Sequence, residues 1–133
     1  MIVCDTNLIV HLLVGDERRP LAEAALRRDA HWVAPPLWRS EFRNVLALYM
    51  RRGLLGLPHA LQVAERAELL MEGRDLPVPS AEVLRLASRS GRSAYDCEFV
   101  ALAQDLGIPL VTSDRAVLAA FPSVAVSLDG FAR

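Results

Sequence analysis

The chain has 133 residues, of which 53% are apolar, and a formal net charge of −1. This length suits a single domain, and the apolar content excludes a disordered chain. All fifteen basic residues are arginine, which excludes P-loop and Schiff-base chemistry because both need lysine. No apolar run approaches the ~20 residues that cross a bilayer, so we expect one cytoplasmic domain, residues 1–133, without membrane contact.

Short apolar runs alternate with amphipathic segments, which is typical of a parallel sheet covered by helices. In chain order we predict a strand at 2–4, helices at 6–14 and 19–28, a strand at 31–34, helices at 37–52 and 58–72, a strand at 75–78, helices at 80–89 and 94–106, a strand at 110–112, a helix at 115–121 and a strand at 124–126. The turn at 53–58 makes its two flanking helices a hairpin. That hairpin is either a dimer or partner surface, or a cap over the sheet.

Two aspartates follow directly on apolar strands. Asp5 ends the run Ile2 to Cys4, and Asp114 follows the run that ends at Thr112 and Ser113. Each is well placed to cap the next helix by accepting a backbone N–H. However, ligands of open parallel sheets bind at the carboxyl ends of the strands. If these two strands are neighbours, the two acids meet at that edge.

Glu41 interrupts an apolar face of the helix predicted at 37–52. The 3.6-residue period aligns it with Leu37, Val45 and Leu48. A carboxylate on a buried face costs several kcal/mol unless a cation or hydrogen bonds compensate it. An inward ion pair with a distant arginine and a bound metal ion are therefore both candidate explanations.

Asp96 resembles Glu41, because it lies on the same face of its helix as Phe99, Val100 and Ala103. Glu98 lies on another side, and we expect it to face solvent or to lie at the rim. Four carboxylates, those of Asp5, Glu41, Asp96 and Asp114, are thus predicted to point inward. Without a cation they would repel one another, and oxygen ligands select Mg²⁺, or Mn²⁺ in its place. The three histidines have no ligand spacing.

The ordered segments "VCDTNLIV", "WRSEFRNVL" and "SAYDCEFVALAQDLGIPLVTSD" resemble those of PIN-domain proteins, and in particular of VapC-like toxic ribonucleases. The resemblance covers essentially the whole chain and all four acids. It implies a three-layer α/β/α fold with a five-stranded parallel sheet in the order 3-2-1-4-5. It also implies an RNA substrate, a cognate antitoxin protein as partner, and a homodimer, for which the hairpin is the candidate surface.

On this basis we expect Mg²⁺-dependent hydrolysis of RNA phosphodiester bonds. Asp5 and Asp96 are the first candidates for direct metal ligands, and Glu41 and Asp114 complete the cluster. Side chains expected to hydrogen-bond to these carboxylates are Thr6, Asn7, Thr112 and Ser113, although ordinary capping would equally explain Thr6 and Ser113. Candidate phosphate contacts are Arg89, Arg92 and Arg115, for which solvated helix ends are an equal alternative.

Two other functions remain open at the level of sequence. A Mg²⁺-dependent phosphatase or phosphotransfer domain would also need clustered acids, but the chain has no lysine and no DxD pair after its first strand. A non-catalytic module could use the acidic cleft to capture a basic peptide. Metal-independent binding would favour this second alternative.

Overall fold

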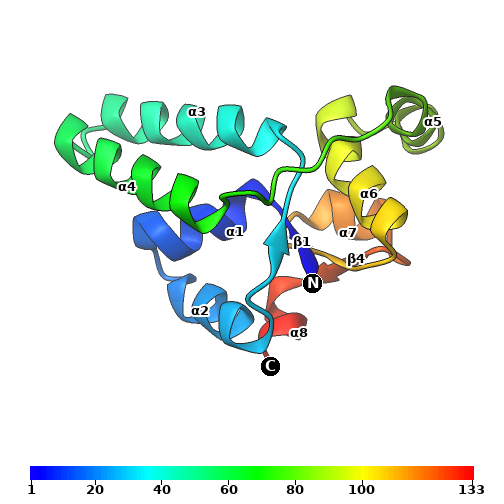
Figure 1. The fold of residues 1–133 in the computed structure, drawn as a ribbon, viewed down its shortest axis with the longest axis horizontal. Helices are drawn as coiled ribbons and strands as arrows, with labels where there is room; N and C mark the ends of the chain where they lie inside the picture. The colour runs from blue at the N-terminus through cyan, green and yellow to red at the C-terminus, as the bar shows by residue number, and fades with distance from the viewer.

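The centre of the fold is a parallel sheet of four strands (Figure 1). In this computed structural model, which describes residues 1–133, the strands are β1 (Ile2–Cys4), β2 (Trp32–Val33), β3 (Leu110–Thr112) and β4 (Ala125–Ser127). Their order is β2-β1-β3-β4, and Val3 pairs with Val33 on one side and with Leu110 on the other. The central strands β1 and β3 are entirely buried, as expected for a parallel sheet covered on both faces.

Nine helical segments surround the sheet. They are α1 (Thr6–Val10), which continues as the π-helical turn η1 (His11–Gly15), α2 (Arg19–Arg28), α3 (Leu37–Arg51), α4 (Leu57–Leu70), α5 (Ser80–Ser90), α6 (Ala94–Leu106), α7 (Arg115–Ala120) and α8 (Leu128–Ala132). All but α8 lie within two residues of the predicted helices. None of them has the length and apolar character that a membrane crossing requires.

The helices form two groups. Helix α6 packs on β1 and β3 and carries α5 on its outer side, whereas α1, η1, α2 and α8 pack with one another and α1 supports α3. Crossover connections between parallel strands are right-handed. A connection that leads toward one edge of the sheet therefore lies on one face, and a connection that leads toward the other edge lies on the opposite face. Helices α3 and α6 therefore approach the carboxyl end of β1 from different directions (Figure 1).

The prediction of a fifth strand at residues 75–78, and hence of a five-stranded sheet, is wrong. Only one parallel bridge forms, between Ala34 and Asp75, in which Leu76 N–H donates to Ala34 O at 3.0 Å. The next step of this ladder would need the N–H of residue 36, and Pro36 has none. The segment still lies beside β2, where the missing strand was expected.

Helix α8 was not predicted. It is only five residues long, contains Gly130, and is capped by Ser127, whose Oγ accepts the Gly130 N–H at 3.0 Å. Such a short segment has little helical tendency of its own. It is held by α2, because Arg28 donates to Phe131 O at 2.6 Å and stacks on the Phe131 ring. Tertiary contact therefore decides this element.

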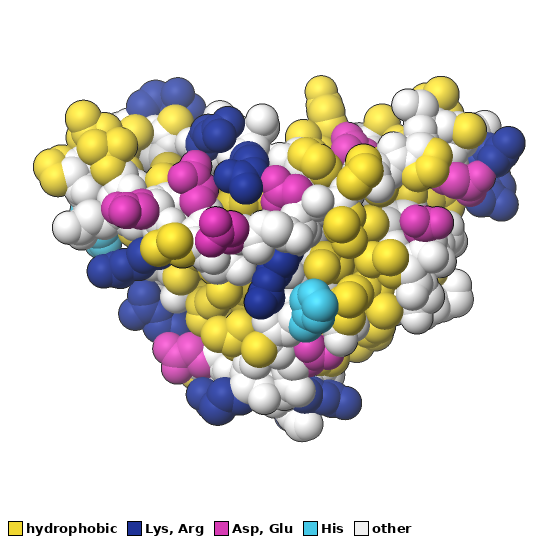
Figure 2. All heavy atoms as spheres, in the orientation of Figure 1, with side chains coloured by type: hydrophobic (Ala, Val, Ile, Leu, Met, Phe, Trp, Pro, Cys, Tyr) yellow, Lys and Arg dark blue, Asp and Glu magenta, His cyan; other side chains and the backbone are white.

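Helices α3 and α4 form the predicted hairpin, which projects from the body of the protein (Figure 1). Its tip carries the exposed side chains of Leu54, Leu57 and Leu61. Figure 2 shows apolar side chains grouped at the end of the arm formed by α3 and α4. The hairpin therefore extends well beyond the sheet, and its tip does not cap the sheet.

Asp75 joins this arm to the sheet edge. Its carboxylate accepts hydrogen bonds from Trp38 Nε1 at 2.6 Å and from Arg39 Nε at 2.7 Å. Trp38 is almost completely buried. Loss of the acceptor would leave the indole N–H unsatisfied, and an unsatisfied buried donor costs about 1–3 kcal/mol.

We expect Asp75→Ala to lower the free energy of unfolding by about 1–3 kcal/mol and the Tm by several degrees. Thermal and urea unfolding followed by circular dichroism measure the change. Asp105→Ala, at an exposed position of α6 with no ion pair, is the control and should unfold like the wild type. Equal stability of the Asp75 and Asp105 variants would contradict this role.

Candidate active site

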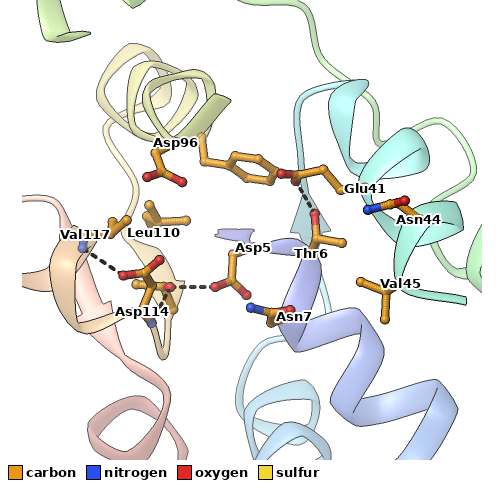
Figure 3. Close-up of a pocket in the computed structure, with 12 residues that line it drawn as sticks. Asp5, Thr6, Asn7, Glu41, Asn44, Val45, Asp96, Leu110, Asp114 and Val117 are labelled. Atoms are coloured by element: carbon orange, nitrogen blue, oxygen red, sulfur yellow. Dashed lines mark hydrogen bonds between the residues drawn. The ribbon is translucent and has the colours of Figure 1, made fainter. Parts of the chain in front are cut away.

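A pocket of about 240 Å³ opens at the carboxyl ends of β1 and β3. All four predicted carboxylates line it, each from a different element (Figure 3). Its full lining is Asp5, Thr6, Asn7, Glu41, Asn44, Val45, Asp96, Phe99, Leu110, Thr112, Asp114 and Val117. Asp5 and Asp114, 109 positions apart in the chain, thus share one cavity, because β1 and β3 are neighbours in the sheet.

Asp5 caps α1, which is one of the two roles considered from the sequence, and it also lines the pocket. Its Oδ1 accepts the Leu8 N–H at 2.9 Å and so caps α1, while its Oδ2 accepts the Thr112 hydroxyl at 2.5 Å. Burial raises the pKa of this carboxyl group, and the charge of Asp114 adds to the rise. The bonds from Thr112 and Leu8, and the proximity of His11, lower the pKa only in part. The negative charge of Asp5 is therefore incompletely compensated.

Glu41 reaches the pocket from α3, where its Oε1 accepts the Thr6 hydroxyl at 2.7 Å. Burial raises its pKa, the Thr6 bond opposes the rise, and the charges of Asp5, Asp96 and Glu98 add to it. No arginine pairs with it, so the alternative of an inward ion pair is wrong.

The apolar face assigned to α3 was displaced by one position. The fully buried side chains of this helix are Trp38, Phe42 and Leu46, whereas Leu37, Val45 and Leu48 are only partly buried. Glu41 stands at the border of the buried face. This position lets a carboxylate face a pocket without entering the core.

Asp96 lies in the first turn of α6, which begins at Ser93, whose hydroxyl accepts the Asp96 N–H at 3.1 Å. Its carboxylate is paired with Arg92, with a distance of 3.0 Å from Nη2 to Oδ2. On the same helix, Glu98 is partly buried, and burial raises its pKa. Glu98 lies outside the pocket lining, in agreement with a position at the rim.

Asp114 caps α7 through a single oxygen. Its Oδ1 accepts the N–H groups of Ala116 at 2.9 Å and Val117 at 3.2 Å. Its own N–H donates to Thr112 Oγ1 at 3.0 Å, and the same hydroxyl donates to Asp5. Thr112 thus connects the two acids that end neighbouring strands.

The donor set fits a hard divalent cation. It consists of carboxylate oxygens alone, and Glu41, Asp96 and Asp114 each hydrogen-bond through only one of their two oxygens. Burial, and to a lesser extent the neighbouring acids, raise the pKa values of Asp5 and Glu41, and a bound cation would favour their ionised forms. In the observed rotamers, no three acidic, histidine or cysteine side chains stand close enough to hold one ion together. Binding would therefore require side-chain rotation.

The side chains expected to support the acids divide into two pairs. Thr6 and Thr112 donate to Glu41 and Asp5, as described above. Asn7 lines the pocket but makes no side-chain hydrogen bond to a carboxylate. Ser113 does not support an acid either, because its Oγ accepts from Arg18 Nη2 at 3.2 Å. The expected Ser113–carboxylate bond is thus replaced by a link from the end of β3 to the residue that precedes α2.

The three arginines named as candidate phosphate contacts lie in different surroundings. Arg92 contacts Asp96 directly, and Arg115 is exposed at the first position of α7, next to Asp114. Arg89 is exposed in the last turn of α5 and lines a separate hollow with Arg85 and Leu84. Only Arg92 and Arg115 therefore adjoin the acidic pocket.

Asn44 is a polar lining residue that the sequence reasoning missed. It follows Glu41 by three positions on α3, so the two share a helix face, and this spacing was the available signal. The remaining lining residues that were not predicted are apolar: Val45, Phe99, Leu110 and Val117. Apolar residues carry no chemical signal of a site, and only the fold places them around the acids.

Residues 2–124 match the PIN domain family. The chain is 36% identical over 128 residues to Ribonuclease VapC3 of Pyrobaculum aerophilum, an alignment that covers 92% of this chain and 96% of that protein.

Solved structures show the same fold. The protein PAE2754 from Pyrobaculum aerophilum superposes with a TM-score of 0.78 at 22% identity, over 98% of this chain and 92% of the other. FitAcB from Neisseria gonorrhoeae gives a TM-score of 0.74 at 22% identity, over 96% and 98% of the two chains. FitAB bound to an IR36 DNA fragment gives 0.73 at 22% identity, over 96% and 95%. With the family match over most of its length, the chain belongs to the PIN-domain family and is a VapC-like member of it.

Proposed function

We propose that this protein is a metal-dependent endoribonuclease that hydrolyses RNA phosphodiester bonds and acts as the toxin of a toxin–antitoxin pair. The observation that carries the proposal is the convergence of Asp5, Glu41, Asp96 and Asp114 on one pocket in a PIN-domain chain. The likeness to a ribonuclease over 92% of the chain supports RNA as the substrate. The small-molecule phosphatase and the non-catalytic binding module have no such support.

Mg²⁺ is the proposed cation, with Mn²⁺ as a substitute, because the available donors are all carboxylate oxygens. Asp5 and Asp96 would hold it, and Glu41 and Asp114 would complete the site directly or through water. When bound, the cation activates water and neutralises charge on the scissile phosphate. Its charge would also favour the ionised forms of Asp5 and Glu41, whose pKa values are raised by burial and, to a lesser extent, by neighbouring acids.

The side chains around the cation have separate tasks. Thr112 fixes the Asp5 carboxylate and the backbone of Asp114, so the two strand ends keep one relative position. Thr6 orients Glu41 in the same way. Since burial makes Glu41 a stronger base, it is the better placed of the outer acids to accept a proton from the attacking water. Asp114 orients that water from the opposite side of the pocket.

The proposed partners are a cognate antitoxin and a second copy of the chain. The acids form a concentrated negative field, which suits an inhibitor that inserts a guanidinium group. The exposed leucines at the tip of the α3–α4 hairpin supply an apolar surface of the kind that a homodimer or an antitoxin helix covers. The protein is proposed to work in the cytoplasm, where its RNA substrate is found.

Asp5→Asn and Asp96→Asn should each lower Mg²⁺-dependent cleavage of a fluorescent oligoribonucleotide by at least about a hundredfold, because an amide replaces a charged ligand at nearly constant shape. Asp105→Asn, an exposed change on α6, is the matched control and should keep wild-type activity. Circular dichroism should show all three folded. Wild-type cleavage in either site variant would remove that residue from the proposed mechanism.

The metal-free protein should become less stable as the pH rises from about 5 to about 7.5. Burial raises the folded-state pKa of Asp5 and Glu41, so the folded chain holds protons that the unfolded chain has already lost. The contribution of these groups to stability therefore falls as the pH rises through their raised pKa values. Tm measured in the presence of a chelator tests this directly.

Asp5→Asn should raise the metal-free Tm at pH 7.5 and reduce its dependence on pH, because the amide carries no charge. The Asp105→Asn variant should follow the wild-type curve. A wild-type Tm that stays constant or rises across this pH range would contradict the assignment of uncompensated charge to the pocket.

Inhibition by the antitoxin should weaken as Mg²⁺ rises, since an inserted arginine and the cation would occupy the same carboxylates. The test is co-purification with the product of the neighbouring gene, followed by titration of Mg²⁺ against the inhibited ribonuclease. Replacing the partner's arginines by glutamine one at a time should identify the inserted residue. Inhibition that responds to neither change would show that the partner does not read the acidic pocket.

A further inference from the structure

Arg92 places its guanidinium group on one of the four acids of the pocket. Its Nη2 lies 3.0 Å and its Nε 3.3 Å from the same oxygen of Asp96, Oδ2. No other acid of the pocket makes an ion pair with an arginine. Asp96, a proposed metal ligand, is thus the one member of the site that already has a cationic partner within the chain.

The turn between α5 and α6 fixes the base of this arginine. Gly91 ends α5 with φ of 71°, a left-handed conformation that favours glycine. Arg92 N–H donates to Ser90 Oγ at 3.1 Å, and Ser93 caps α6 by accepting the Asp96 N–H. The backbone of Arg92 is therefore held one turn before Asp96. Only the long side chain remains free to change its direction.

The stability of α6 does not explain this arginine. A cation next to a helix N-terminus is unfavourably placed with respect to the helix dipole. The Arg92 and Asp96 side chains are 36% and 29% exposed, and a pair this exposed contributes at most about fivefold to an equilibrium constant. The contact is thus weak enough for a divalent cation to displace it.

We propose that Arg92 is an intramolecular counter-ion of the acidic pocket, which pairs with Asp96 in the metal-free protein and is displaced when a divalent cation binds. In the metal-free protein, Arg92 offsets part of the repulsion among the acids. When the cation takes over Asp96, the guanidinium becomes free at the rim of the pocket. A free guanidinium there is suited to bidentate contact with a phosphate of the substrate.

This inference has two parts, one about a cation and one about RNA. The RNA part rests on the proposed function, whereas the cation part does not. Competition between Arg92 and a cation for Asp96 is a property of the chain alone. Release of Arg92 toward a phosphate requires RNA to bind at the same site. An experiment can therefore contradict one part and leave the other standing.

The competition between Arg92 and a cation is tested with Mn²⁺ alone, by calorimetric titration of chelator-treated full-length protein. Arg92→Gln should bind Mn²⁺ roughly twofold to fivefold more tightly than the wild type, because the competing pair is lost. Arg92→Lys keeps the charge and should return the affinity toward the wild-type value. Arg89→Gln is the matched control, since Arg89 is an exposed arginine nearby that makes no ion pair.

Equal affinities of the Arg92→Gln and Arg89→Gln variants would overturn the proposal, because the effect would then come from net charge rather than from the pair. Weaker Mn²⁺ binding by Arg92→Gln would overturn it as well. Tm of the metal-free variants provides a second measurement. Arg92→Gln should be slightly less stable than wild type without metal and should gain more on addition of Mn²⁺.

The contact between Arg92 and a substrate phosphate is tested at saturating Mg²⁺ with a short oligoribonucleotide. Arg92→Gln should raise KM roughly threefold or more with little change in kcat, as expected for a lost contact that binds ground state and transition state alike. An unchanged KM would overturn the phosphate role of Arg92. Absence of any cleavage by the wild type would instead overturn the proposed function, and the Mn²⁺ titration would still decide the counter-ion role.

Discussion

The burial of Asp5 and Glu41 beside further carboxylates is the constraint on which this site depends. Burial and mutual repulsion raise the pKa of Glu41, and burial with the charge of Asp114 raises that of Asp5. The protein offsets this cost with local donors: Thr112 and Leu8 at Asp5, Thr6 at Glu41. These donors offset only part of the cost of burying the carboxylates, and the remaining cost favours the binding of a cation. The electrostatic cost and the proposed function therefore have one origin.

The sheet topology supplies the convergence. The strands β1 and β3 are neighbours in the sheet, so their carboxyl ends lie side by side. Asp5 follows the first of these ends, and Asp114 lies shortly after the second. Helices α3 and α6 then bring the other two acids from the flanks. Thr112 belongs to both parts of this arrangement, since its hydroxyl donates to Asp5 and accepts from Asp114. A single side chain thus fixes the relation between two acids that are 109 positions apart.

Arginine pairs with carboxylates at several places around this frame. Arg39 fastens α3 to Asp75, and Arg18 links the end of β3 to Asp129 on α8. These contacts join elements far apart in sequence and are structural. Arg92 differs because it acts within one turn of chain and on a residue of the pocket itself. Its position on an acid of the pocket connects the charge balance of the metal-free protein with recognition of a phosphate.

The sequence by itself determined the four strands of the sheet, the helices other than α8 and the four candidate acids, because these follow from local chemistry. Strand and helix periods are visible in short windows, and a carboxylate that follows an apolar strand is visible there too, as at Asp5 and Asp114. The class of fold followed from the order of these elements, and the motif resemblance is borne out by the match over residues 2–124.

Tertiary structure decided what depends on a distant partner. The fifth strand fails because Pro36, on the neighbouring segment, has no N–H to offer. Helix α8 exists because α2 holds it, and Ser113 turns away from the acids because Arg18 lies within reach. The pairing of Arg92 with Asp96 depends on the left-handed turn at Gly91 and on the rotamers of two long side chains, which no local pattern of residues encodes.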